Sequence, residues 1–193
     1  MSDAILTAPV TPVTALGNAF HDGGVKIAET GPYGMVVLRG VLKNTAIQIA
    51  VLNVTGLAVP APRRLSLQGA RRAIWFSPDE LLLIVAHSEL KAIQGALTTA
   101  LENVHSLVAD ISDARACFHL SGEETHLHEV VGRLMPIDMS DFKHLDVRRT
   151  RLGQIPAALW MAQPGSFDLV CFRSTARYAF DLLTQAAKSP KIF

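Results

Sequence analysis

The sequence predicts an α+β fold made of two similar half-units, each a mostly antiparallel sheet with helices. Two features carry this prediction. Short runs of β-type residues follow one another across tight connectors, and a single amphipathic helix follows the strands in each half of the chain. We therefore expect an extended N-terminal arm over residues 1–33 and one α+β domain over residues 34–193. Its half-units span about residues 34–103 and 104–193.

The N-terminal arm is expected because its composition does not favour a core. Pro, Gly and Thr are frequent over the first thirty or so residues, and such a segment is ordered mainly when a neighbour holds it. An arm of this kind is well suited to wrapping a partner protein.

Several apolar runs predict the strands of the first half-unit. Ile47, Ile49 and Val51 alternate with polar or small residues, which is strand periodicity. Residues 73–76 and 81–86 flank a connector whose second turn position is Pro78, so we expect a hairpin there. The other predicted strands cover residues 35–39, 104–111, 117–120, 151–155, 157–161 and 167–172.

Three amphipathic helices are predicted, over residues 89–102, 123–134 and 175–187. Ser88 and Ser174 are the expected N-caps of the first and third helices, and Pro136 ends the second. The expected buried positions are Leu90, Ile93, Leu97, Leu101, Leu127, Val130, Val131, Leu134, Tyr178, Leu182, Leu183 and Ala186.

The composition favours a protein that works with a partner. Hydrophobic residues make up 49% of the chain and charged residues 18%, whereas an ordinary soluble domain has about 25% charged residues. Apolar surface left after folding usually meets a partner. The net charge of +1 gives no electrostatic case for nucleic acid or for an acidic membrane.

The chain is expected to be cytoplasmic. The N-terminal residues lack the basic and apolar regions of a signal peptide, and no stretch is long and apolar enough to span a membrane. The two cysteines, Cys117 and Cys171, are far apart in sequence and form no CxxC pattern, so we expect reduced core residues.

Motifs for chemistry are lacking, so we predict no catalytic, cofactor-binding or metal-binding residue on this chain. Neither GxGxxG nor a P-loop occurs in a suitable context. His126 and His128 are two positions apart on a predicted helix, where their rings point in opposite directions and cannot share one ion. His119 is expected to face a core and to bind a backbone carbonyl. Cys171 lies in an apolar run that would raise its pKa.

Basic residues cluster at Arg148-Arg149-x-Arg151, and also at Arg63-Arg64 and Arg71-Arg72. Three arginines in four residues are able to clamp a phosphate or a carboxylate, to pair across an interface, or to form a solvated edge. No aromatic residues alternate with them, so a platform for single-stranded nucleic acid is not expected.

A series of short motifs resembles the γ subunit of heterotetrameric sarcosine oxidase, over about residues 70–185. Their order and spacing carry the resemblance more than any single motif does. The motifs are Trp75-Phe76-Ser77-Pro78-Asp79-Glu80-Leu81-Leu82, Asp110-Ile111-Ser112 with Arg115, Leu120-Ser121-Gly122, Pro136-Ile137-Asp138, Thr150-Arg151, Ile155-Pro156, Trp160, and residues 167–172 followed by Arg173-Ser174, Ala176 and Tyr178.

The resemblance implies a fold similar to the folate-binding domain of the glycine-cleavage T-protein. It implies a non-catalytic γ subunit that supports assembly with the α subunit, and with β and δ. The FAD, FMN, NAD and tetrahydrofolate of the complex are then expected on the larger subunits, and zinc on δ. Arg115, Arg151 and Arg173 lie in these motifs beside strand ends, and we expect them to be structural or interfacial.

A second hypothesis remains open. The chain would then be a free-standing, T-protein-like folate-binding aminomethyltransferase or repair protein. That function requires an acid facing a central hole, and no residue of this sequence can be matched to one. Tetrahydrofolate binding by the isolated chain would favour the second hypothesis.

Overall fold

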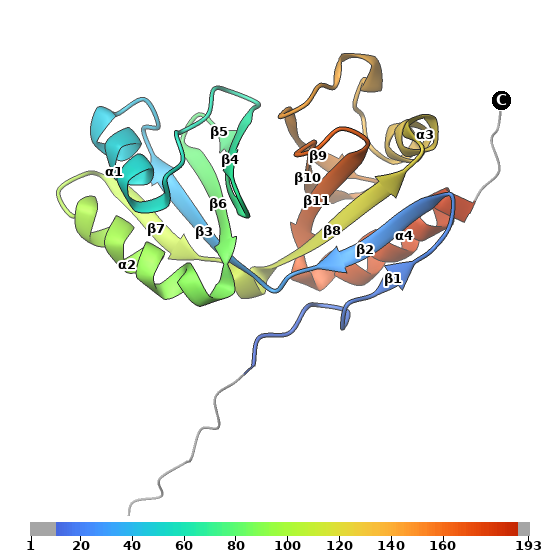
Figure 1. The fold of residues 1–193 in the computed structure, drawn as a ribbon, viewed down its shortest axis with the longest axis horizontal. Coiled ribbons are helices and arrows are strands. Elements are labelled where there is room, and N and C mark those ends of the chain that lie inside the picture. Colours follow the sequence, from blue (N-terminus) through green and yellow to red (C-terminus); the bar gives the residue numbers. More distant parts are fainter. Residues whose placement is uncertain (1–10, 189–193) are drawn as a thin grey trace, which may run out of the picture.

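The computed structural model describes residues 11–188, which fold into four layers in the order helix, sheet, sheet, helix (Figure 1). Both sheets are antiparallel throughout, which confirms the predicted α+β class. The elements are β1 Phe20–His21, β2 Val25–Thr30, β3 Tyr33–Gly40, α1 Thr45–Thr55, β4 Leu65–Gln68, β5 Arg71–Ser77, β6 Glu80–Ala86, α2 Leu90–Ala100, β7 Ser106–Asp110, β8 Arg115–Gly122, α3 Glu124–Leu134, β9 Val147–Leu152, β10 Ile155–Trp160, β11 Ser166–Phe172 and α4 Ala176–Lys188.

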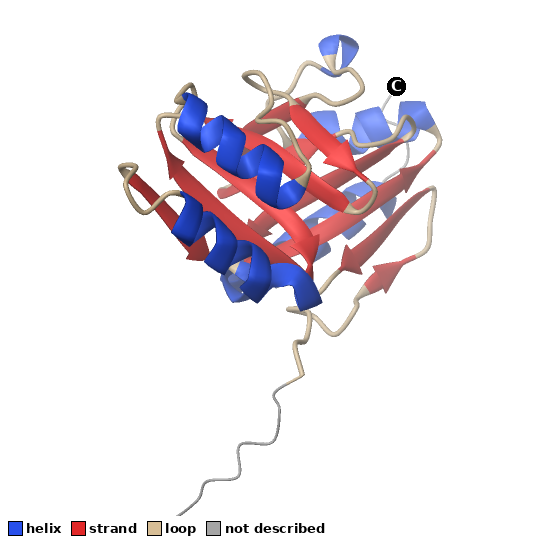
Figure 2. Ribbon diagram, turned by 60° about the vertical axis from the view of Figure 1, so that its left-hand side comes forward, coloured by secondary structure: helices blue, strands red, loops and turns tan. Residues whose placement is uncertain are grey.

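The two sheets repeat one strand order. The first sheet runs β4-β5-β6-β3-β7, and the second runs β9-β10-β11-β8-β2 with β1 added at its edge. One helix of each half-unit follows β3 or β8, and the second helix follows the central strand, β6 or β11. Helices α1 and α2 cover the outer face of the first sheet, and α3 and α4 cover that of the second (Figure 2).

Each of the two sheets contains one strand that the sequence places outside its own half of the chain. Strand β2 precedes the first half-unit in sequence but pairs with β8 of the second sheet, whereas β7 follows residue 103 and pairs with β3 of the first sheet. The sheets therefore do not follow the boundaries predicted at residues 33 and 103. Part of the predicted arm is a sheet strand, and residues 1–10 lie outside the described residues.

The strand predicted over residues 47–51 is wrong, because these residues form α1. Asn44 caps this helix, since its side chain accepts a hydrogen bond of 2.9 Å from the N–H of Ala46. At the other end Gly56 adopts φ +76°, a left-handed conformation that ends helices. Ile47, Ala50 and Val51 are buried at helical spacing, so the five-residue alternation was too short to distinguish the two periods.

Some of the other local predictions are confirmed, and others are wrong. The hairpin at Pro78 and the helices predicted over residues 89–102, 123–134 and 175–187 are confirmed. The strand over residues 151–155 is wrong because Leu152 pairs with Ile155 across a turn at Gly153, φ +55°. Ser88 and Ser174 are wrong as helix caps, since both lie inside 3-10 turns. Tyr178 is 42% exposed rather than buried, because small residues of α4 face the sheet instead.

An apolar layer fills the space between the two sheets. It contains only strand and loop residues, whereas the helices take part in two separate outer cores. Trp160 is 2% exposed and is the largest fully buried side chain of the described residues. The members of this inter-sheet layer are Met35, Leu65, Ile74, Phe76, Leu82, Ile84, Cys117, Val147, Ala158, Trp160, Ala162 and Val170.

The two sheets are also joined directly where β4 and β9 begin. The N–H of Leu65 donates to the carbonyl of Leu145 at 3.0 Å, and the N–H of Val147 donates to the carbonyl of Arg63 at 2.9 Å. These two bonds frame a single antiparallel bridge between Arg64 and Asp146. No helix within residues 11–188 has the length and apolar character needed to cross a membrane.

The contact between β2 and β8 can be tested with a pair of glycine variants. A Cβ on Gly122 would lie 2.6 Å from the carbonyl oxygen of Gly24, so Gly122→Ala must push the two strands apart. We expect a loss of about 1–3 kcal/mol in the free energy of unfolding, measured with urea.

The matched control is Gly95→Ala on α2, where an added Cβ meets nothing within 4 Å. Alanine is a better helix former than glycine, so this variant should gain about 0.5–1 kcal/mol. A Gly122→Ala protein as stable as the wild type would contradict the close approach of β2 to β8.

Candidate functional site

The arginines that cluster in the sequence bind acids that lie far away in the sequence. Asp146 is 8% exposed and lies directly before β9. One of its carboxylate oxygens accepts from Nη1 of Arg64, and the other accepts from Nη2 of Arg148 at 3.4 Å. Because Arg64 lies beside β4, this ion cluster ties the start of one sheet to the start of the other.

The electrostatic environment of Asp146 favours its ionised form. Burial acts to raise the pKa of Asp146, but the hydrogen bond from the N–H of Lys143 and the guanidinium of Arg64 outweigh it. The pKa therefore lies below its ordinary value, and the carboxylate is charged at neutral pH.

Glu80 forms a second link between the sheets. It is 7% exposed at the start of β6, and its Oε2 accepts from Nη2 of Arg39 at 3.3 Å and from Nη1 of Arg149 at 3.2 Å. Arg149 lies on β9 of the opposite sheet. Two members of the basic cluster are thus structural partners of buried acids, whereas Arg151 is exposed and has no ion pair among the described residues.

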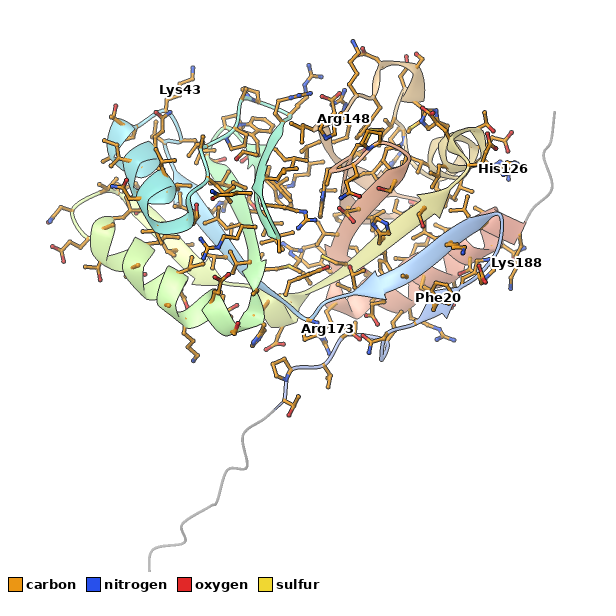
Figure 3. All side chains as sticks on the ribbon, in the orientation of Figure 1. Phe20, Lys43, His126, Arg148, Arg173 and Lys188 are labelled. Carbon is orange, nitrogen blue, oxygen red and sulfur yellow. The ribbon has the colours of Figure 1, made fainter. Side chains whose placement is uncertain are left out.

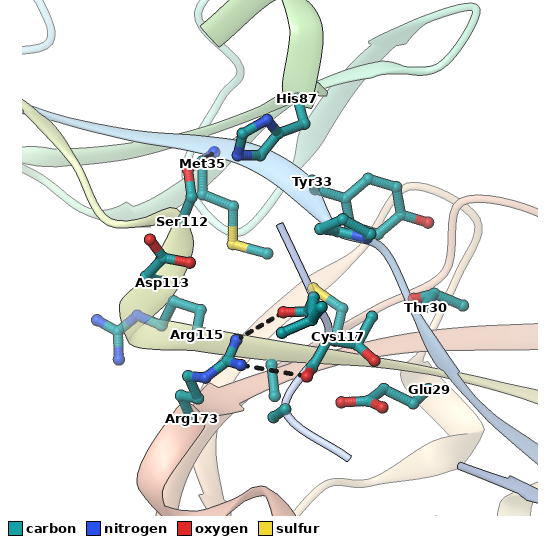
Figure 4. Close-up of a pocket in the computed structure, with 15 residues that line it drawn as sticks. Glu29, Thr30, Tyr33, Met35, His87, Ser112, Asp113, Arg115, Cys117 and Arg173 are labelled. Carbon is teal, nitrogen blue, oxygen red and sulfur yellow. Dashed lines mark hydrogen bonds between the residues drawn. The ribbon is translucent and has the colours of Figure 1, made fainter. Parts of the chain in front are cut away.

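The segment over residues 13–19 is held at both its carbonyls and its amides. Figure 4 shows the contacts that Arg173 makes with the carbonyls. Arg173 donates to the carbonyl oxygens of Val13 and Thr14, both at 3.1 Å. The buried carboxylate of Glu29 accepts from the N–H groups of Leu16 and Asn18, each at 2.9 Å. These contacts fix the start of the described chain beside a pocket of about 20 Å³.

A second hollow, which we term the Arg115 pocket, lies between β8, β10 and β11 and the loop end of β5. The guanidinium of Arg115 stacks on Phe172, 3.9 Å from the ring centre, and that of Arg149 lies 5.3 Å from the ring centre of Phe76. The pocket measures about 40 Å³ and is lined by Phe76, Arg115, Arg149, Pro156, Ala157, Ala158, Val170, Cys171 and Phe172.

The two cysteines are free and buried, as predicted. Cys117 and Cys171 lie on neighbouring strands but one step apart in register, so their side chains point to opposite faces of the sheet. Burial raises the pKa of Cys117 far above its ordinary value and that of Cys171 to about 11. Neither thiol forms an appreciable amount of thiolate at neutral pH.

The histidines do not form a metal site within residues 11–188, where no group of three suitable ligands occurs. His126 lies near Glu123 on α3, and His128 lies near Glu124 with its ring 6.1 Å from that of the buried Phe167. His119 was expected to bind a backbone carbonyl in the core. Instead its Nδ1 lies 2.8 Å from Oδ1 of Asp168, directly across the strand pair β8–β11, and its side chain is 37% exposed.

The fold and these contacts define a class of protein: two antiparallel half-units packed face to face, with arginine–carboxylate links between them. The chain belongs to the sarcosine oxidase γ subunit family. The model of that family, "Sarcosine oxidase, gamma subunit family", matches residues 39–189, which is most of the chain. The family resemblance carried by the sequence motifs is thereby confirmed.

Solved structures show the same fold. A chain of the heterotetrameric sarcosine oxidase from Corynebacterium sp. U-96, in complex with pyrrole 2-carboxylate, has a TM-score of 0.77 and 24% identity over 88% of each chain. The glycine cleavage system aminomethyltransferase T from Bartonella henselae has a TM-score of 0.59 and 11% identity. That match covers 80% of this chain and 44% of the aminomethyltransferase. No curated protein matches the chain.

The link at Asp146 predicts an acid-dependent loss of stability. Because the folded-state pKa of Asp146 lies below its ordinary value of 3.8, the stabilisation is complete above that value. It is lost as the pH falls through the folded-state pKa. At pH 7 we expect Asp146→Asn to lower the free energy of unfolding by about 1–3 kcal/mol, with the deficit shrinking below about pH 4.

The control for this measurement is Asp141→Asn. The Asp141 side chain is 75% exposed and lies 3.7 Å from Nζ of Lys143, so this pair contributes about 0.5 kcal/mol or less. Equal effects of the two variants across the pH range would contradict the proposed link.

Proposed function

We propose that this chain is the non-catalytic γ subunit of a heterotetrameric sarcosine oxidase and supports assembly of the complex that oxidatively demethylates sarcosine. The observation that carries the proposal is the match of the family over residues 39–189. The contacts of this chain are in keeping with a structural role. Its buried acids Glu80 and Asp146 bind arginines, its thiols are buried, and the space between the sheets is filled by side chains.

The cofactors of the reaction are proposed to lie on the other subunits. We expect FAD, FMN, NAD and tetrahydrofolate there and none on this chain. The partner is proposed to be the α subunit, together with β and δ, in a cytoplasmic complex that involves neither nucleic acid nor a membrane. The near-zero net charge of +1 supports a protein partner over a polyanionic one.

The outer surface of the first half-unit supports a hetero-oligomer. Helix α1 contains no charged residue, and its Ile49 and Leu52 are 52% and 49% exposed. The corresponding helix of the second half-unit, α3, carries Glu124, Glu129 and Arg133. Two halves with one architecture thus differ in surface chemistry, and an apolar outer face is the more suitable one for burial against another subunit.

The alternative function, a free-standing T-protein-like aminomethyltransferase or repair protein, is not favoured. The family match names the oxidase subunit, and the chain spans 44% of the aminomethyltransferase that it resembles in fold. Tetrahydrofolate binding by the isolated chain would reopen this alternative.

The proposal predicts the behaviour of the isolated chain. Purified alone, it should show no flavin absorbance and no oxidation of sarcosine. Its melting temperature should rise with the concentration of the remaining subunits, because a partner that binds only the folded chain stabilises it by mass action.

The matching control is the assembled complex, assayed for flavin absorbance and sarcosine turnover under the same conditions. A stable monomer that retains bound flavin, or that oxidises sarcosine unaided, would refute the subunit proposal.

A further inference from the structure

The Arg115 pocket has a feature that the fold itself does not require. Arg115 is the first residue of β8 and pairs with Phe172 of β11. At the corresponding place in the first half-unit, Tyr33 is the first residue of β3 and pairs with Ala86. The same strand geometry therefore forms without an arginine and without an aromatic partner for it.

No ion pair balances the charge of Arg115 among residues 11–188. The Nε of Arg115 is buried and has no hydrogen-bond partner among the described residues. The acid that acts on it electrostatically is Glu80, whose carboxylate already binds Arg39 and Arg149. In Figure 4 the guanidinium of Arg115 points away from the contact that Arg173 makes.

Burial lowers the pKa of Arg115 from its ordinary value, and the nearby positive charge of Arg149 acts in the same direction. The side chain thus bears a desolvation cost that the chain offsets only partly. A half-buried guanidinium with unused donors is a strong receptor for a carboxylate, which accepts two parallel N–H bonds.

The walls of the pocket suit the stem of an acidic side chain. Phe76 is 6% exposed and forms the inner wall, whereas Phe172 is 40% exposed at the rim. Pro156 is exposed as well. An exposed aromatic ring stacked on an arginine, next to a small apolar hollow, is typical of the residues that dominate protein–protein binding energy.

We infer that the Arg115 pocket receives the carboxylate of an aspartate or glutamate side chain from another subunit of the complex. The carboxylate binds the free donors of Arg115, and its methylene stem packs against Phe172. This inference rests on the proposed function, because it requires a partner subunit. It assigns Arg115 to the interface, whereas Arg149 belongs to the internal link with Glu80.

The test compares assembly of matched variants with the remaining subunits of the complex. Arg115→Met removes the charge and the donors but keeps an apolar stem on Phe172. Arg115→Lys keeps the charge without the bidentate fork. The control is Arg177→Met on the exposed face of α4, where Arg177 pairs with Asp181. The readouts are the dissociation constant of this chain from the remaining subunits and the melting temperature of the isolated chain.

We expect Arg115→Met to weaken binding about 30-fold or more, Arg115→Lys to have an intermediate effect, and Arg177→Met to stay within about twofold of the wild type. Salt should weaken wild-type binding more steeply than binding of Arg115→Met. The isolated Arg115→Met chain should melt within about 2 °C of the wild type, because no acceptor within residues 11–188 loses a bond.

Three results would overturn the inference: wild-type affinity of Arg115→Met, loss of stability in the isolated variant that accounts for its weaker assembly, or tight binding of a free acid such as benzoate that is lost in Arg115→Met. If the wild-type chain joins no complex at all, the proposed function fails instead. The two failures are therefore distinguishable.

Discussion

The apolar layer between the two sheets is the constraint on which the rest of the structure depends. Each sheet has helices on one face only, so its other face is buried solely by the opposite half-unit. Figure 3 shows side chains filling the space between the sheets, with Arg148 at one end of this space and Arg173 at the other. Neither half-unit has a complete core without its neighbour.

The polar contacts at the edge of this layer follow from the same constraint. A carboxylate is costly to bury unless cations satisfy it, and Glu80 and Asp146 are each bound by two arginines. Each acid binds arginines from both sheets or from beside both, so satisfying it also fixes how the sheets face each other. Strands β2 and β7 have a similar consequence. Strand β2 completes the second sheet although it precedes the first half-unit in sequence, and β7 completes the first sheet although it follows residue 103.

Local patterns in the sequence are sufficient for the fold class, for the three predicted helices and for the hairpin at Pro78, because each depends on residues close together in the chain. Failures arose where partners are distant. Arg64 and Asp146 are 82 residues apart, and Arg149 and Glu80 are 69 apart, so no spacing rule could connect them. The composition of residues 1–33 predicts an arm, and no local pattern reveals β2 within it, because its partner β8 lies in the other half of the chain. The strand prediction where α1 forms is wrong for a different reason: a short apolar run fits both the strand and the helix periodicity.

Arg115 shows how far sequence reasoning reached at the candidate site. Its place in a family motif led us to expect a structural or interfacial role. Only the structure shows that its Nε is buried without an acceptor while neighbouring Arg149 has one. The sequence alone does not distinguish Arg115 from Arg149, because the difference depends on which of the two binds Glu80 in the folded chain.

The central claim is that this chain acts as one subunit of a hetero-oligomer. The most direct measurement is native mass spectrometry of the assembly that co-purifies with this chain from its natural source. The account predicts one copy of this chain together with three different other chains and the flavins of the complex. When this chain is released from the assembly, no flavin should stay bound to it. Recovery of this chain alone, with flavin or tetrahydrofolate bound to it, would contradict the account.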